Sequence, residues 1–108
     1  MKTAITIPTL IAHLMAADNK PYLSVKRLQN AMYHINVALH KQGIADGYDL
    51  AFDPSPAAIE QAVLCNNRAF DLDSDGDLIY ARQGIDVLTQ HYPIDSKVSS
   101  IIKAFAHE

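Results

Sequence analysis

The sequence contains little cysteine, little glycine and no long apolar run, and each scarcity excludes a class of protein. The single cysteine, Cys65, cannot form an internal disulfide or anchor a zinc site by itself, so we expect a reducing, cytoplasmic setting. No stretch reaches the roughly 18 apolar residues that a membrane-spanning helix needs, so we expect no membrane partner. The four glycines are scattered and form no glycine-rich phosphate loop.

The chain also lacks an excess of positive charge. Nine lysines and arginines stand against twelve aspartates and glutamates, and the formal net charge is -3 at pH 7. Because binding to phosphate backbones is driven by basic residues, we do not expect indiscriminate nucleic-acid binding. A length of 108 residues with 49% hydrophobic and 19% charged residues is typical of one globular domain.

The stretch SVKRLQNAMYHINVALHKQG, residues 24–43, predicts a central helix around which the chain is organised. Ser24 is suited to cap the first turn, and Gly43 is suited to the left-handed position that closes a helix. Apolar residues recur at helical spacing and form one broad stripe that requires burial. The stripe consists of Val25, Leu28, Met32, Ile35 and Leu39, with Ala31 and Ala38 beside it.

The opposite side of this helix is more apolar than a solvated surface requires. Tyr33 and Val37 lie there one turn apart, among Lys26, Asn30 and Lys41. Either a second layer of the protein's own core or a partner should cover them. We call these five residues the outer face of the helix and predict that they form a partner-binding site.

Four further helices and one hairpin are predicted around the central helix. The four helices cover residues 8–17, 55–66, 85–92 and 95–105, delimited by capping residues and prolines. Cys65 is expected to pack as a small apolar group. Residues 48–52 alternate as in a short strand, and residues 70–80 predict a hairpin around Asp75-Gly76. The predicted fold is mainly α with one short β-hairpin, in a single compact domain of about five helices.

An acidic run in the predicted hairpin resembles the start of an EF-hand calcium loop. The candidate ligands are Asp71, Asp73, Asp75 and Asp77. Arg82 stands at the twelfth position, where such a loop needs a bidentate glutamate. Because Asp and Gly also form tight turns, we interpret the run as an acidic hairpin tip and expect no cofactor. A module that binds a divalent, calcium-like cation is the alternative.

The order helix, helix, hairpin is also the outline of a winged helix, with residues 55–67 as recognition helix and residues 70–80 as wing. The chemistry opposes this interpretation, because the helix offers Glu60 and Gln61 and the wing carries four aspartates. A small DNA-binding regulator is therefore a second alternative. The five histidines have no partner at a catalytic spacing, so we predict no enzymatic activity.

Three collinear segments resemble the Panacea domain, the family of SocA-like antitoxins. Residues 23–43, LSVKRLQNAMYHINVALHKQG, are similar to the family's helix with a Lys-Leu-Gln run and a tyrosine. Residues 52–63 resemble its aromatic and Gly-Pro before a helix, with Asp53 in place of the glycine, and residues 87–107 resemble its closing Tyr, Ser and His. The resemblance implies a non-enzymatic bacterial or phage protein that neutralises a toxin-like protein partner by direct contact. The sequence leaves the oligomeric state open.

Overall fold

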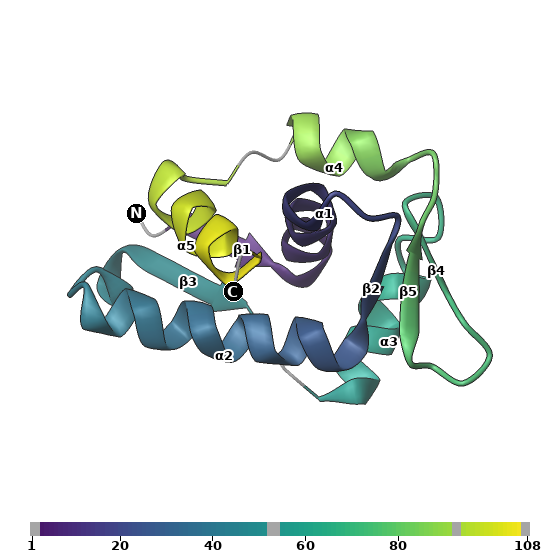
Figure 1. The fold of residues 1–108 in the computed structure, drawn as a ribbon, viewed down its shortest axis with the longest axis horizontal. Coiled ribbons are helices and arrows are strands. Elements are labelled where there is room, and N and C mark those ends of the chain that lie inside the picture. Colours follow the sequence, from purple (N-terminus) through teal and green to yellow (C-terminus); the bar gives the residue numbers. More distant parts are fainter. Residues whose placement is uncertain (1–2, 52–54, 92–93, 107–108) are drawn as a thin grey trace.

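Five helices and five short strands make up the computed structural model, which describes residues 3–51, 55–91 and 94–106 (Figure 1). The helices are α1 (Ile7–Asp18), α2 (Val25–Lys41), α3 (Pro56–Leu64), α4 (Ile85–His91) and α5 (Ser96–Ala106). The strands are β1 (Thr3–Thr6), β2 (Tyr22–Ser24), β3 (Tyr48–Ala51), β4 (Phe70–Leu72) and β5 (Leu78–Ala81). A mainly α protein with a small antiparallel sheet is thus confirmed.

The longest helix, α2, begins and ends where its sequence indicates. The Ser24 hydroxyl accepts a hydrogen bond from the backbone N–H of Arg27 at 3.0 Å, which satisfies a free amide of the first turn. Gly43 follows the helix with φ at 69°, in the left-handed region that favours glycine. The predicted apolar stripe is buried through Leu28, Ala31, Met32, Ile35 and Leu39. The central helix is therefore confirmed, with Ser24 and Gly43 as its flanking residues.

The first helix, α1, supplies much of the single hydrophobic core. Its buried side chains are Ile7, Leu10, Ile11, Ala12, Leu14 and Met15. This helix contacts α3, α4 and α5, while α2 packs on α5 and runs along one side of the molecule (Figure 1). Because α2 lies at that side, one of its faces meets the core and the other is left to the surface.

Two separate sheets join segments that are distant in the chain. The antiparallel sheet has the order β2-β5-β4, and β1 pairs with β3 in parallel. The hairpin was predicted, whereas β1 and β2 were not. Neither of these strands is joined to its partner by a turn, because β1 pairs with β3 and β2 pairs with β5, so no hairpin signal marks them. The inner side of the antiparallel sheet reaches the core through Leu23, Phe70 and Ile79.

The cysteine does not pack in the core, so this expectation was wrong. Helix α3 ends at Leu64, and Cys65 is exposed. The buried side of α3 carries Ile59 and Val63, four residues apart. Cys65 stands two residues beyond Val63 and therefore points about 200° around the helix axis from it, away from the core.

The side chain of Tyr48 on β3 lies near the start of α5. Tyr48 is only 8% exposed, and the carboxylate of Asp95 acts on its hydroxyl. The same carboxylate accepts a hydrogen bond from the backbone N–H of Lys97 at 2.8 Å, so Asp95 caps α5 as the sequence indicates. Desolvation of the buried ring, together with the negative charge of Asp95, raises the pKa of Tyr48 above its usual value.

The raised pKa of Tyr48 predicts a loss of stability in alkaline solution. In the unfolded chain the phenol ionises at about pH 10, and in the folded protein it ionises at a higher pH. The stabilisation is therefore complete below about pH 10 and is lost as the pH rises through the folded pKa. Urea unfolding between about pH 8 and pH 11 should show this loss in the parent and less of it in Tyr48→Phe. Tyr33→Phe is the matched control and should lose stability like the parent. Equal losses in the parent and in Tyr48→Phe would contradict the assignment.

Candidate partner-binding site

The outer face of α2 is open to solvent. Tyr33 is 74% exposed, more than any other large hydrophobic side chain of the described residues. Lys26, Asn30 and Lys41 are exposed as well, and Val37 is partly exposed. The sequence left two explanations for this face, a second core layer or a partner. Within the described part of the chain, nothing forms a core layer over Tyr33.

The five outer-face residues form one continuous stripe along α2. The residues that follow Lys26 at distances of four, seven, eleven and fifteen positions are Asn30, Tyr33, Val37 and Lys41. These spacings place all five residues on one side of the helix. At 1.5 Å per residue the stripe is about 22 Å long. Lys26 and Lys41 lie at its two ends and Tyr33 near its middle, so an exposed aromatic ring stands between two positive charges.

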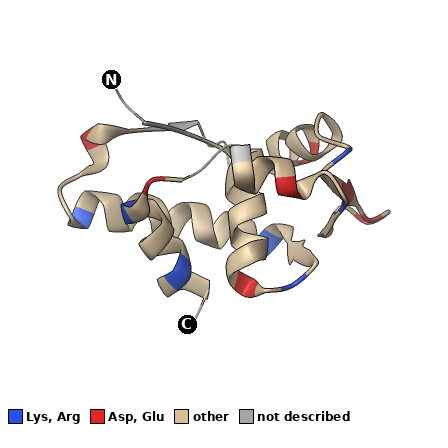
Figure 2. Cartoon of the chain, turned by 90° about the horizontal axis from the view of Figure 1, so that it is seen from above, with Lys and Arg blue, Asp and Glu red and all other residues tan. Residues whose placement is uncertain are grey.

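Neither α2 nor α5, which packs against it, contains an acidic residue. The charged residues of α2 are Lys26, Arg27 and Lys41, and those of α5 are Lys97 and Lys103. The acidic residues of the hairpin lie at one end of the molecule (Figure 2). The two helices therefore carry only positive side-chain charges, although the acidic hairpin begins beside the first turn of α2, where the backbone N–H of Val25 donates to the carbonyl of Asp77 at 2.9 Å.

Arg27 and His34 stand beside the outer face and connect α2 to its neighbours. Two N–H groups of Arg27 donate to the two carboxylate oxygens of Asp18 on α1, at 2.9 and 2.8 Å. The guanidinium carbon lies 4.7 Å from the ring centroid of Phe105 on α5, and the His34 ring is 5.4 Å from the same centroid. The hydrogen bonds to Asp18 raise the pKa of Arg27 by more than partial burial lowers it, so the pKa lies above its usual value. Arg27 is thus engaged within the fold, whereas no ion pair involves Lys26 or Lys41 among the described residues.

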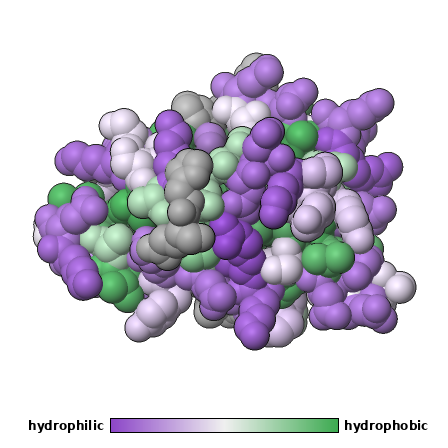
Figure 3. Space-filling model, in the orientation of Figure 1, coloured by the Kyte–Doolittle hydropathy of each residue, from purple (hydrophilic) through white to green (hydrophobic). Residues whose placement is uncertain are grey.

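Most of the molecular surface in the view of Figure 3 is hydrophilic, broken by small separate hydrophobic patches. A partner that approaches this side would therefore meet polar and charged groups around each apolar contact.

One aspartate of the hairpin, Asp73, stabilises the turn itself. Asp73 Oδ1 accepts hydrogen bonds from the backbone N–H groups of Asp77 and Leu78, at 2.8 and 3.2 Å. Gly76 has φ at 74°, as the tight turn requires, and Asp71 lies in strand β4 with its side chain exposed. In the part of the chain that the structure describes, no three His, Cys, Asp or Glu side chains are placed to hold a metal ion.

Calcium titration tests the alternative of a cation site at Asp71, Asp73, Asp75 and Asp77. We predict weak and unselective binding, because Asp73 is engaged with backbone amides and Arg82 replaces the bidentate glutamate. Calorimetry should therefore give no dissociation constant at or below the micromolar range. A micromolar constant that is lost in Asp73→Asn and kept in Asp86→Asn, an exposed aspartate of α4, would restore the calcium interpretation.

The winged-helix outline is present in the structure, because β2 lies beside the hairpin and α1, α2 and α3 precede it. The exposed side of α3, which would face DNA, carries Ala57, Glu60, Gln61 and Leu64 and no basic residue. Leu64 is 59% exposed. A surface of this kind opposes contact with phosphates and is poor in base-reading side chains, with Gln61 as its one candidate.

Sequence reasoning missed a pair of tyrosines on the outer side of the antiparallel sheet. Tyr22 and Tyr80 are direct partners across β2 and β5 and are 43% and 42% exposed. The Lys20 ammonium lies 5.8 Å from the centroid of the Tyr22 ring. The pair could not be recognised without β2, because the two residues are 58 positions apart in the chain.

Comparisons of the chain with models of protein families, with curated proteins and with solved structures gave no match. No helix in the described residues is long and apolar enough to cross a membrane. The class of protein is defined by the fold and its surface alone. It is a small, mainly α protein with an exposed basic and aromatic helix face.

Proposed function

We propose that this protein is a non-enzymatic, protein-binding module whose outer face, on α2, docks on an acidic surface of a protein partner. One observation carries the proposal: the ring of Tyr33 is 74% exposed between two lysines on a helix without acidic residues. Tyrosine is enriched among the residues that dominate binding energy at protein interfaces. A well-ordered helix also presents such a ring at low entropic cost.

The charges of α2 indicate the chemistry of the partner. Lys26 and Lys41 have no acidic neighbour on their own helix, so a carboxylate-rich surface would complement them. Such complementarity accelerates association and fixes the orientation of the two proteins. The acidic partner surface would meet the Tyr33 ring between the two ion pairs.

The resemblance to the Panacea domain supports a toxin as the partner. One of the three similar segments, residues 23–43, contains all five outer-face residues. On this proposal the protein is an antitoxin-like or adaptor protein of bacterial or phage origin that neutralises its partner in the cytoplasm. The product of an adjacent gene is then the first partner to test.

The winged-helix outline favours a second function, a small DNA-binding regulator, on grounds of topology alone. The exposed side of α3 and the acidic hairpin weigh against it, because both would face phosphates with negative charge. Saturable retention of the protein's own promoter at physiological salt would favour the regulator.

A double variant of the outer face tests the proposed function. Tyr33→Ala with Lys41→Ala should fold like the parent and lose on the order of 2 kcal/mol of binding energy, about 30-fold in dissociation constant. The readouts are calorimetry with the adjacent gene's product and rescue of growth when the two proteins are co-expressed. The matched control, Lys20→Ala with Tyr22→Ala, also removes one lysine and one exposed tyrosine and should bind like the parent.

Thermal melts separate a docking surface from a part of the core. Ile35→Asp places a charge at a position with 0% exposure and should unfold the protein. If the double variant melts as badly as Ile35→Asp, the outer face is part of the core. If it folds and binds like the parent, the partner docks elsewhere and the proposal is wrong.

A further inference from the structure

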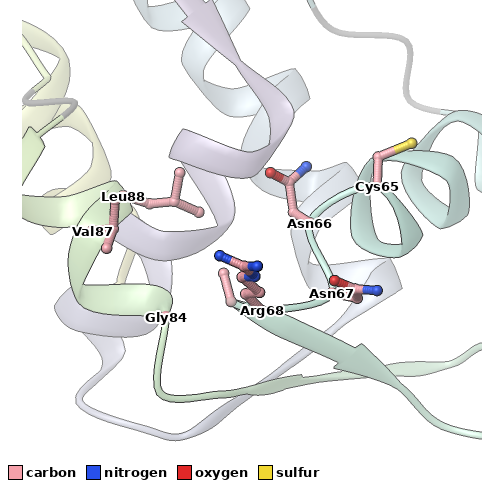
Figure 4. A pocket seen from close by; sticks show the side chains of 8 residues that line it. Cys65, Asn66, Asn67, Arg68, Gly84, Val87 and Leu88 are labelled. Carbon is pink, nitrogen blue, oxygen red and sulfur yellow. The ribbon is translucent and has the colours of Figure 1, made fainter.

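A hollow of about 360 Å³ opens between the end of α3 and the start of α4. One wall is the loop that leads from α3 to β4, with Asn66, Asn67 and Arg68, and the other is formed by Gly84, Val87 and Leu88 (Figure 4). Its volume is within the range of small-molecule sites. The hollow lies on a different part of the surface from the outer face of α2, so it does not depend on the proposed function.

Backbone hydrogen bonds hold the two walls in place. The carbonyl of Asn66 accepts from the N–H groups of Ala69 and Phe70, both at 3.0 Å. The carbonyl of Arg68 accepts from the N–H of Gly84 at 2.9 Å, and a Cβ at Gly84 would lie only 2.6 Å from that oxygen. Glycine is therefore required for the close approach of the walls. The hollow exists before any ligand enters it, which lowers the entropic cost of binding.

The two walls differ in chemistry. Arg68 is exposed, no acidic residue lines the hollow, and no carboxylate lies within ion-pair distance of Arg68 among the described residues. Asn66 donates its amide N–H to the carbonyl of Ala62 at 2.7 Å, which orients this side chain. On the facing wall Val87 is 53% exposed, with Leu88 beside it (Figure 4). One wall thus offers an unpaired guanidinium and the other an apolar surface.

We propose that this hollow binds a small carboxylate that carries a short aliphatic chain. The guanidinium of Arg68 would donate two parallel N–H groups to the two carboxylate oxygens, the arrangement for which arginine is suited. The aliphatic chain would lie on Val87 and Leu88 and remove apolar surface from water. A free short-chain acid and the C-terminal residue of a peptide share this chemistry.

Titration with hexanoate, followed by nuclear magnetic resonance, tests the site in the intact protein. We expect saturable shifts confined to residues 65–69 and 84–88, with a dissociation constant on the order of 1 mM. Acetate lacks the chain and hexanol lacks the charge, so both should bind more weakly. A short peptide that ends in leucine tests the second source of the carboxylate. If the natural ligand is a peptide C-terminus, the peptide with a free carboxylate should bind and the same peptide with a C-terminal amide should not.

Three variants separate this site from general anion binding. Arg68→Gln should weaken hexanoate at least about tenfold, and Val87→Ser should reduce the advantage of hexanoate over acetate. Arg82→Gln removes another exposed arginine and should leave the affinity unchanged. Three results would overturn the proposal: shifts that do not saturate by about 50 mM, equal affinity in Arg68→Gln, or an equal loss in Arg82→Gln. Thermal melts show that each variant is folded before it is titrated.

Discussion

The side chain of Arg27 joins three helices, and the position of α2 depends on that junction. Its guanidinium donates two hydrogen bonds to Asp18 at the end of α1 and lies over the ring of Phe105 near the end of α5. The side chain of Asp18 is only 8% exposed, so its charge is largely removed from water and needs this partner. The ring of His34 packs on Phe105 from the next turns of α2.

The apolar stripe determines which side of α2 meets the core, and the junction lies at the edge of that side. With Arg27 and His34 directed toward α1 and α5, the apolar stripe of α2 turns inward and the outer face turns outward. The arrangement leaves Tyr33 in solvent between Lys26 and Lys41, while the acidic residues of the hairpin lie at the end of the molecule. Exposure of the Tyr33 ring therefore accompanies burial of the apolar stripe on the opposite side of the same helix.

The sequence predicts local features of this fold well and distant pairings poorly. Caps and helical periodicity indicate α2 because Ser24, Ile35 and Gly43 each act within one helix. The location of the outer face follows from the same periodicity. Its exposure does not, because it depends on which segments of the chain pack nearby.

Contacts between distant residues could not be predicted from local patterns. No turn joins β2 to β5, so the pairing of Tyr22 with Tyr80 has no local signal. The hollow at Arg68 likewise arises where α3 and α4 meet, and Gly84 in the sequence indicates only a break in the chain. The double hydrogen bond between Asp18 and Arg27 also depends on the angle between two helices.

A double-mutant cycle on Asp18 and Arg27 tests most directly whether their junction anchors α2. Asp18→Ala, Arg27→Ala and the double variant would be compared with the parent in urea unfolding at neutral pH. For a bidentate, partly buried pair the account predicts a coupling energy of about 1–2 kcal/mol, so that the second substitution costs much less than the first. Free energies of unfolding that add within about 0.3 kcal/mol would show that the pair does not hold α2 in place and would contradict the account.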